Sequence, residues 1–114
     1  MFEKIEKRNG QIVKFEAGKI TTAIGKAGAA TGEFGEKVAQ KLTLKVLSLA
    51  QNLITDRIPT VEEIQDVVEE VLLSSPYRRT ARAYIIYREQ HARIREISTA
   101  ASLDLVDQYL AKSD

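Results

Sequence analysis

A short run of residues near the N-terminus combines the features that phosphate binding requires. A predicted strand ending at Phe15 passes directly into a helix that begins near Ala17. The first turn of a helix carries free backbone N–H groups and the positive end of the helix dipole, which together attract anions. Lys19 lies in that turn, where the dipole disfavours a cation, so a bound anion explains it better than helix capping does. Gly18 lets the backbone approach such a ligand closely.

The hairpin before this helix adds further cations. Asn9-Gly10 is the strongest short signal for a two-residue hairpin turn, because both positions tolerate a positive φ. In the register that this turn sets, Lys7 and Lys14 share one face with Ile5, so charged and apolar residues are mixed. A half-buried hairpin normally separates the two kinds. The mixture indicates that some of these cations face an anion, although lysines that protect a sheet edge remain the alternative.

The residues after the hairpin could surround a nucleotide rather than a bare phosphate. Phe15 and Ile20 can supply apolar walls for a base, and Glu16 can accept hydrogen bonds from a ribose or an exocyclic amine. Neither Gly-x-x-x-x-Gly-Lys-Ser/Thr nor Gly-x-Gly-x-x-Gly occurs, so the common NTPase and dinucleotide fingerprints do not apply.

Composition narrows the classes of function. The chain has 114 residues, enough for one domain, and 44% of them are hydrophobic. It has no cysteine and one histidine, His91, which excludes thiolate zinc sites, a cysteine nucleophile and a histidine-containing catalytic triad within the chain. A net charge of +1 argues against nucleic acid as a partner. No apolar run approaches the ~20 residues that span a bilayer and no signal peptide is visible, so we expect no membrane association and a cytoplasmic protein.

The elements that must position these residues follow from periodicity and capping signals. We predict an α+β fold in which the N-terminal hairpin covers a four-helix bundle, followed by a short C-terminal helix. Ile58-Pro59 reads as a short extended piece and a possible third strand, and Ser75-Pro76 reads as the N-cap and first residue of the fourth helix. The predicted elements are a hairpin over 2–16, helices over 17–30 and 33–54, a helix opened by a capping box at Thr60–Glu63, a helix over 77–97, and an apolar segment containing Leu103, Leu105, Val106, Tyr109 and Leu110.

The spacing of these blocks resembles one known family. Lys7-Arg8-Asn9-Gly10 followed by Val13-x-Phe15-Glu16-x-x-Lys19-Ile20 is similar to the opening of the ATP-cone domain, the allosteric nucleotide-binding module of ribonucleotide reductases. The resemblance continues in order through 58–65 and 81–88. Residues 102–114 look like the connector into the catalytic domain of the anaerobic (class III) enzymes. The resemblance implies an ATP-cone over 1–97 and a connector helix over 98–114 leading to a catalytic domain.

The resemblance implies a regulatory function without catalytic residues in this chain. ATP or dATP would be the effector, carried with Mg²⁺, with ATP permitting and dATP stopping the activity of a reductase through nucleotide-dependent homo-oligomerisation. Cations would hold the phosphates, 13–16 with Ile20 would line the base and ribose, and two helices would close the site. The implied nucleotide-binding residues are Ile5, Lys7, Arg8, Val13, Lys14, Phe15, Glu16, Lys19, Ile20, Thr60, Gln65, Arg88 and Gln90.

Several alternatives stay open at this point. Glu16 replaces the shorter Asp or Asn of the family pattern, and some relatives carry His or Asp near Gln65, so one or two nucleotides could bind. The ATP preference over dATP and the oligomer that each favours are also open. The chain could be the N-terminal domain of a larger enzyme or a stand-alone regulator of reductase gene expression, although the zinc ribbon of such regulators needs four thiolates. A purely structural interaction bundle is the remaining alternative.

Overall fold

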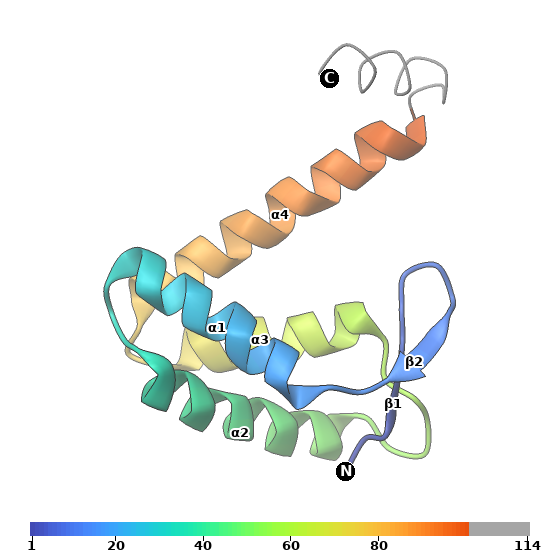
Figure 1. The fold of residues 1–114 in the computed structure, drawn as a ribbon, viewed down its shortest axis with the longest axis horizontal. Helices are drawn as coiled ribbons and strands as arrows, with labels where there is room; N and C mark the ends of the chain where they lie inside the picture. The colour runs from blue at the N-terminus through green and yellow to red at the C-terminus, as the bar shows by residue number, and fades with distance from the viewer. Residues whose placement is uncertain (101–114) are drawn as a thin grey trace. The chain divides into compact units, whose positions relative to one another are not determined.

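The computed structural model describes residues 1–100 of the chain. Two strands lead into four helices, and the α+β prediction is confirmed (Figure 1). The elements are β1 (Lys4–Glu6), β2 (Ile12–Lys14), α1 (Ala17–Thr31), α2 (Glu36–Leu53), α3 (Val61–Ser74) and α4 (Arg78–Ala100). The predicted apolar helix between Leu103 and Leu110 lies outside the described residues.

The chain divides into two compact units. Met1–Tyr84 contains the hairpin, α1, α2, α3 and the first turns of α4, and the second unit begins at Ile85. Over its described residues the second unit is the remainder of α4. It is stabilised along its own surface by an Arg93–Glu89 ion pair of 3.0 Å, one helical turn apart.

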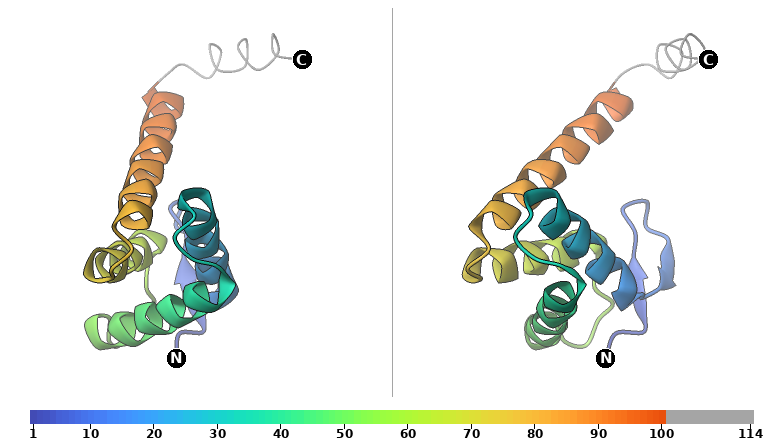
Figure 2. Two further views of the ribbon diagram at one scale, coloured as in Figure 1. Left: turned by 90° about the vertical axis from the view of Figure 1, so that its left-hand side faces the viewer. Right: turned by 60° about the vertical axis from the view of Figure 1, so that its left-hand side comes forward.

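The core of the first unit forms where the apolar faces of three helices meet. α1 packs against α2, and α2 packs against α3 (Figure 2). The buried side recurs every three or four residues in each helix, as an amphipathic helix requires. The buried cluster comprises Phe15, Ile20, Ile24, Ala39, Leu42, Val46, Leu47, Ala50, Ile54, Ile64, Val67, Val68, Val71, Leu72, Ala81 and Tyr84.

The hairpin register differs by one residue from the predicted one. Ile5 pairs with Val13, and the Lys7 amide donates to the Gln11 carbonyl at 2.8 Å. The connection is therefore a three-residue loop, not the two-residue turn that Asn9-Gly10 suggested. Because a shift of one residue exchanges the two faces of a strand, Ile5 and Val13 now share the half-buried face. Lys14 now lies opposite Lys4 and away from the Ile5 face, which corrects that part of the prediction. Lys7 still alternates onto the face of Ile5, and the exposed Ile12 lies on the face of Lys14, so charged and apolar residues remain partly mixed.

The extended piece near residue 58 does lie beside the hairpin. The Glu6 amide donates to the Pro59 carbonyl at 2.9 Å, and Glu6 and Thr60 form an isolated parallel bridge. A single bridge, rather than a full third strand, thus connects β1 to the start of α3. It places the hairpin next to the first turn of α3.

The start of α4 lies within one residue of the prediction, since the helix begins at Arg78 rather than Tyr77. The Ser75 hydroxyl accepts the Tyr77 amide at 3.2 Å, as a capping side chain does, and it also donates to the Leu72 carbonyl at 2.6 Å at the end of α3. A second contact at this helix start comes from Glu33, in the α1–α2 loop. The Glu33 carboxylate accepts the Thr80 backbone N–H at 2.5 Å and the Thr80 hydroxyl at 2.8 Å. A carboxylate at a helix N-terminus satisfies free amides and complements the dipole, which no local pattern at 75–76 could show.

Candidate functional site

The hairpin loop presents two of the predicted site residues at its tip. The Gly10 amide donates to the Lys7 carbonyl at 2.9 Å, and Gly10 has a φ of 85°. This is a turn followed by a left-handed residue, a common geometry for three-residue hairpin loops. The Asn9 side-chain oxygen accepts the Gln11 amide at 2.9 Å and closes the loop. Lys7 and Arg8 therefore extend from a loop whose backbone is well fixed.

Arg8 connects this loop to α3. Its Nε donates to Glu62 Oε1 at 3.2 Å, and its Nη2 donates to Gln65 Oε1 at 2.8 Å. Arg8 and Gln65 lie 57 positions apart in the sequence, and both were predicted to belong to one site. The structure brings them into contact. Glu62 was not among the predicted residues, although it directly precedes the capping acid of α3.

The first turn of α3 is fixed by a network around Thr60. The Thr60 hydroxyl accepts the Glu63 amide at 3.1 Å, and the Glu63 carboxylate accepts the Thr60 amide at 2.9 Å, so the predicted capping box is present. Arg57 donates to both carboxylate oxygens of Glu63. These hydrogen bonds, that from Arg57 first, lower the pKa of Glu63 to about 2. Thr60 is thus a structural cap, and its contact with a ligand stays a prediction.

The start of α1 lies at the other end of β2. Glu16 is the N-cap residue in an extended conformation, without a side-chain capping bond. Its carboxylate pairs instead with Lys19 Nζ at 3.2 Å, and both side chains are largely exposed. The first turn of α1 contains no acidic residue. The exposed first turn with its single cation is the arrangement that the sequence predicted for an anion site.

The apolar residues predicted to line a base divide into two groups. Phe15 and Ile20 are buried in the core, and the Phe15 ring packs against Phe2 with centroids 5.6 Å apart. Ile5 and Val13 are half-buried and lie opposite each other in the hairpin. Ile5 and Val13 are therefore better placed to contact a ligand than Phe15 and Ile20, which pack in the core beneath the hairpin and α1.

The remaining predicted residues are cations of the hairpin and two residues of α4. Lys7 and Lys14 are exposed, and neither forms an ion pair with another residue between 1 and 100. Lys14 stands opposite Lys4 in the register. Arg88 and Gln90 lie on α4 within the second unit, so their part in the site stays a prediction.

Within residues 1–100 no three His, Cys, Asp or Glu side chains gather in a way that could hold a metal ion. In the same range, every helix is too short or too polar to pass through a membrane.

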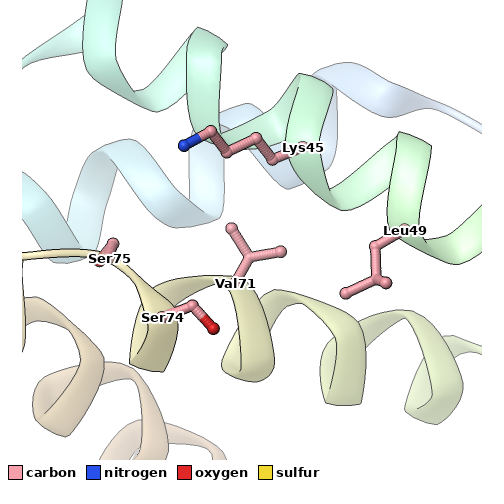
Figure 3. A pocket seen from close by; sticks show the side chains of 5 residues that line it. All are labelled: Lys45, Leu49, Val71, Ser74 and Ser75. Carbon is pink, nitrogen blue, oxygen red and sulfur yellow. The ribbon is translucent and has the colours of Figure 1, made fainter.

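A hollow of about 230 Å³ lies elsewhere in the first unit, between α2 and the end of α3 (Figure 3). No local pattern predicted this hollow, because its walls come from separate helices. None of the predicted site residues lines it, and its single charged group is one ammonium. The lining residues are Lys45, Leu49, Val71, Ser74 and Ser75. One cation with apolar walls offers less to a polyphosphate than the hairpin and the two helix starts do.

Comparison with known proteins identifies the family of this chain. A family model for the ATP cone domain matches residues 3–93. A vitamin B12-dependent ribonucleoside-diphosphate reductase of Thermoplasma acidophilum is 42% identical over 101 residues, which cover 84% of this chain and 13% of that protein. The alpha subunit of a ribonucleoside-diphosphate reductase of Chlamydia trachomatis is 32% identical over 101 residues, which cover 81% of this chain and 10% of that subunit. An anaerobic ribonucleoside-triphosphate reductase of Haemophilus influenzae is 33% identical over 94 residues, which cover 79% of this chain and 13% of that protein.

These relatives include anaerobic reductases, as the sequence suggested, and also reductases of other kinds. The chain spans only 10–13% of the length of these three relatives. Their catalytic activity therefore does not transfer to it directly. The family match, in contrast, includes the hairpin, the start of α1, the start of α3 and most of α4. The chain belongs to the ATP-cone family.

Proposed function

We propose that this chain is the nucleotide-sensing regulatory domain of a ribonucleotide reductase, with ATP and dATP as its effectors. The contact of Arg8 with Gln65 is the observation that carries the proposal. It joins the hairpin to the first turns of α3, two of the segments that the family shares, around a cation suited to phosphate. A structural tether between the hairpin and α3 would also explain this contact, so nucleotide titration is what separates the two functions.

The residues divide into roles by chemistry. Lys7, Arg8 and Lys19 would hold the phosphates, because they are cations at the loop tip and in the first turn of α1. The base and ribose would lie along the face of the hairpin that carries Ile5 and Val13. The remaining residues would complete the site from the hairpin and from the other helices. They are Lys14, Phe15, Glu16, Ile20, Thr60, Gln65, Arg88 and Gln90.

Magnesium would be coordinated chiefly by the phosphate oxygens of the nucleotide, since Mg²⁺ commonly binds through substrate phosphates and retains waters. The described residues 1–100 offer no group of three ligating side chains for it. The protein's part would then be to bind the metal-nucleotide complex through its cations.

Regulation would follow from a difference in how the domain associates when ATP or dATP is bound. In this proposal ATP permits activity of the reductase and dATP stops it by favouring another homo-oligomer. The kind of reductase that carries the domain belongs to the same proposal, with the anaerobic enzymes as our first choice. The mass of the protein in solution with each nucleotide would test this, and identical masses would contradict it.

Calorimetric titration with ATP and dATP tests the binding itself. We expect saturable binding at submillimolar concentration and discrimination at the ribose 2′ position. Lys7→Ala, Arg8→Ala and Lys19→Ala combined should abolish it, because the three ammonium and guanidinium groups that contact phosphate are removed.

A matched control removes three exposed lysines from other parts of the first unit, through Lys26→Ala, Lys37→Ala and Lys41→Ala. The control triple variant should bind as the wild type does. Equal binding by all three proteins would show that these three cations do not hold the nucleotide, and no binding by the wild type would favour the structural bundle. Equal loss in both variants would indicate a general charge effect only.

A further inference from the structure

The Arg8 side chain is held by α3 through one edge of its guanidinium. Its Nε contacts the Glu62 carboxylate at 3.2 Å, and its Nη2 contacts the Gln65 amide oxygen at 2.8 Å. Arg8 is one-third exposed and Glu62 is 61% exposed, so the pair lies at the surface and can exchange partners. Both donors of this edge are therefore engaged by the protein itself.

Arginine recognises phosphate best through two parallel N–H donors of one edge. The Nε–Nη2 edge provides such a pair, and here it faces a carboxylate and an amide from α3. A phosphate oxygen at this edge would meet the Glu62 carboxylate at close range, and two anions cannot both pair with the same donor. Gln65 is neutral and poses no such conflict.

We propose that Glu62 competes with the nucleotide phosphates for Arg8, so that binding is an exchange of carboxylate for phosphate and Glu62 weakens it. This inference rests on the proposed function, because it takes phosphate to be the ligand of Arg8. It assigns to Glu62 a part in setting the affinity of the domain, although Glu62 was not among the predicted ligand residues. Glu16 stands in a similar relation to Lys19 at 3.2 Å, but the cation of that pair is 80% exposed, far more than Arg8.

The opposite role for Glu62 is a tether that places Arg8 correctly. Glu62→Gln separates the competing role from the tethering role, because glutamine keeps an oxygen that can accept from Arg8 Nε but carries no charge. If Glu62 competes, the variant binds ATP more tightly. If Glu62 only positions Arg8, the variant binds equally or more weakly.

The test is calorimetric titration of ATP at low ionic strength, where a surface charge is least screened. We expect Glu62→Gln to bind about two- to fivefold more tightly than the wild type, the range that corresponds to one exposed ion pair. Glu70→Gln is the matched control, since it removes an exposed carboxylate from the same helix. It should leave the affinity unchanged.

Two further variants, Arg8→Ala and Arg8→Ala with Glu62→Gln, test whether the effect of Glu62 on ATP affinity depends on Arg8. The gain from Glu62→Gln should disappear when it is made in an Arg8→Ala background. A gain that persists there, an equal gain in Glu70→Gln, or no gain at all would overturn the exchange.

Inorganic tripolyphosphate distinguishes failure of this inference from failure of the proposed function. The Arg8 side-chain NMR signal should shift on adding tripolyphosphate, and more readily in Glu62→Gln. A response to tripolyphosphate without saturable ATP binding would overturn the nucleotide function and keep the exchange. Normal ATP binding that Glu62→Gln does not strengthen would overturn the exchange and keep the function.

Discussion

Arg57 and Glu63 form a two-point ion pair in which the guanidinium donates to both carboxylate oxygens, with Nη1 to Oε1 at 2.7 Å. The same carboxylate accepts the Thr60 backbone N–H. Together these bonds fix the start of α3, where Glu62 in the first turn and Gln65 just after it contact Arg8. The hydrogen bond to Glu63 also raises the pKa of Arg57. A charged pair beside the site thus determines where α3 begins.

Glu63→Gln should make this stabilisation visible through its pH dependence. The pKa of Glu63 is about 2, below the ordinary 4.5, so the carboxylate stabilises the fold above pH 4.5 and loses this effect as the pH falls toward 2. Glutamine can still accept from the Thr60 amide but carries no charge. Because Glu63 is partly exposed, we expect the free energy of unfolding at neutral pH to fall by only about 1 kcal/mol. Urea denaturation over a pH series measures this loss, and the free energies of unfolding of the wild type and Glu63→Gln should converge near pH 2.

Glu70→Gln provides the comparison for this series, since Glu70 is an exposed acid further along the same helix. Its stability should follow that of the wild type at each pH. A Glu63→Gln effect of equal size at every pH would show that the ion pair with Arg57 contributes nothing to it.

Thr80→Val should loosen the start of α4. Thr80 is fully buried, its amide and hydroxyl both donate to Glu33, and its hydroxyl lies 2.8 Å from that of Thr31. Burial raises the pKa of Glu33, but the hydrogen bonds from Thr80 outweigh this and leave the pKa below 4.5. Valine has the same shape without the hydroxyl, so we expect a loss of about 1–2 kcal/mol in the free energy of unfolding, by chemical denaturation.

Thr22→Val is the control for this change, because the Thr22 hydroxyl is exposed and contacts only its own helix, at the Gly18 carbonyl. It should cost much less than Thr80→Val. Equal losses would mean that the contact between Thr80 and the α1–α2 loop does not stabilise the protein.

The parts of the fold that could be predicted are those set by neighbours in the sequence. The Thr60–Glu63 capping box and the end of α1 at Gly32, whose φ is 75°, depend on residues within one turn. The start of α4 lies one residue from the predicted one, but its contact with Glu33 could not be predicted in this way. Glu33 lies 47 positions from Thr80 and adds to the local hydrogen bond that Ser75 accepts from Tyr77. Contacts between distant segments leave no local signal.

The hairpin register shows the same limit at shorter range. Asn9-Gly10 suits a two-residue turn and also a three-residue loop ending in a left-handed glycine. The choice is decided by Ile5 and Val13, which are half-buried together only in the second case. For the site, residue patterns and the family resemblance grouped Arg8 with Gln65, and the structure places them in contact. Glu62 could not be predicted, because no local pattern shows that it lies beside Arg8, 54 positions away.

Gly10→Ala should destabilise the hairpin loop. Gly10 has a φ of 85°, a conformation that a side chain with Cβ rarely adopts. We expect a loss of about 1 kcal/mol in the free energy of unfolding, with faster amide exchange at Lys7 and Gln11. Gly10→Asn should cost less, because asparagine tolerates this region. Gly18→Ala is the control: it lies in a helix with open space at its Cβ position, and it should be neutral or stabilising. Equal effects at 10 and 18 would contradict the left-handed loop.

Gly28→Ala tests the closest approach in the first unit. A Cβ at Gly28 would lie 2.3 Å from Cε1 of the Phe34 ring, which packs edge-on against Tyr77 with centroids 4.7 Å apart. The ring cannot move without losing that contact, so we expect a loss of about 1–3 kcal/mol in the free energy of unfolding despite the higher helix propensity of alanine. Adding Phe34→Leu should recover part of this loss, because the smaller side chain can shift.

Gly25, in the same helix, provides a control that separates steric crowding from helix propensity. A Cβ at Gly25 would meet only the Ala39 Cβ at 3.8 Å, an ordinary contact. Gly25→Ala should therefore stabilise the protein, by up to about 1 kcal/mol from helix propensity. Chemical denaturation of the two single variants and of Gly28→Ala with Phe34→Leu completes the comparison. If Gly28→Ala proves as stable as Gly25→Ala, the Phe34 ring does not pack over α1 at this position.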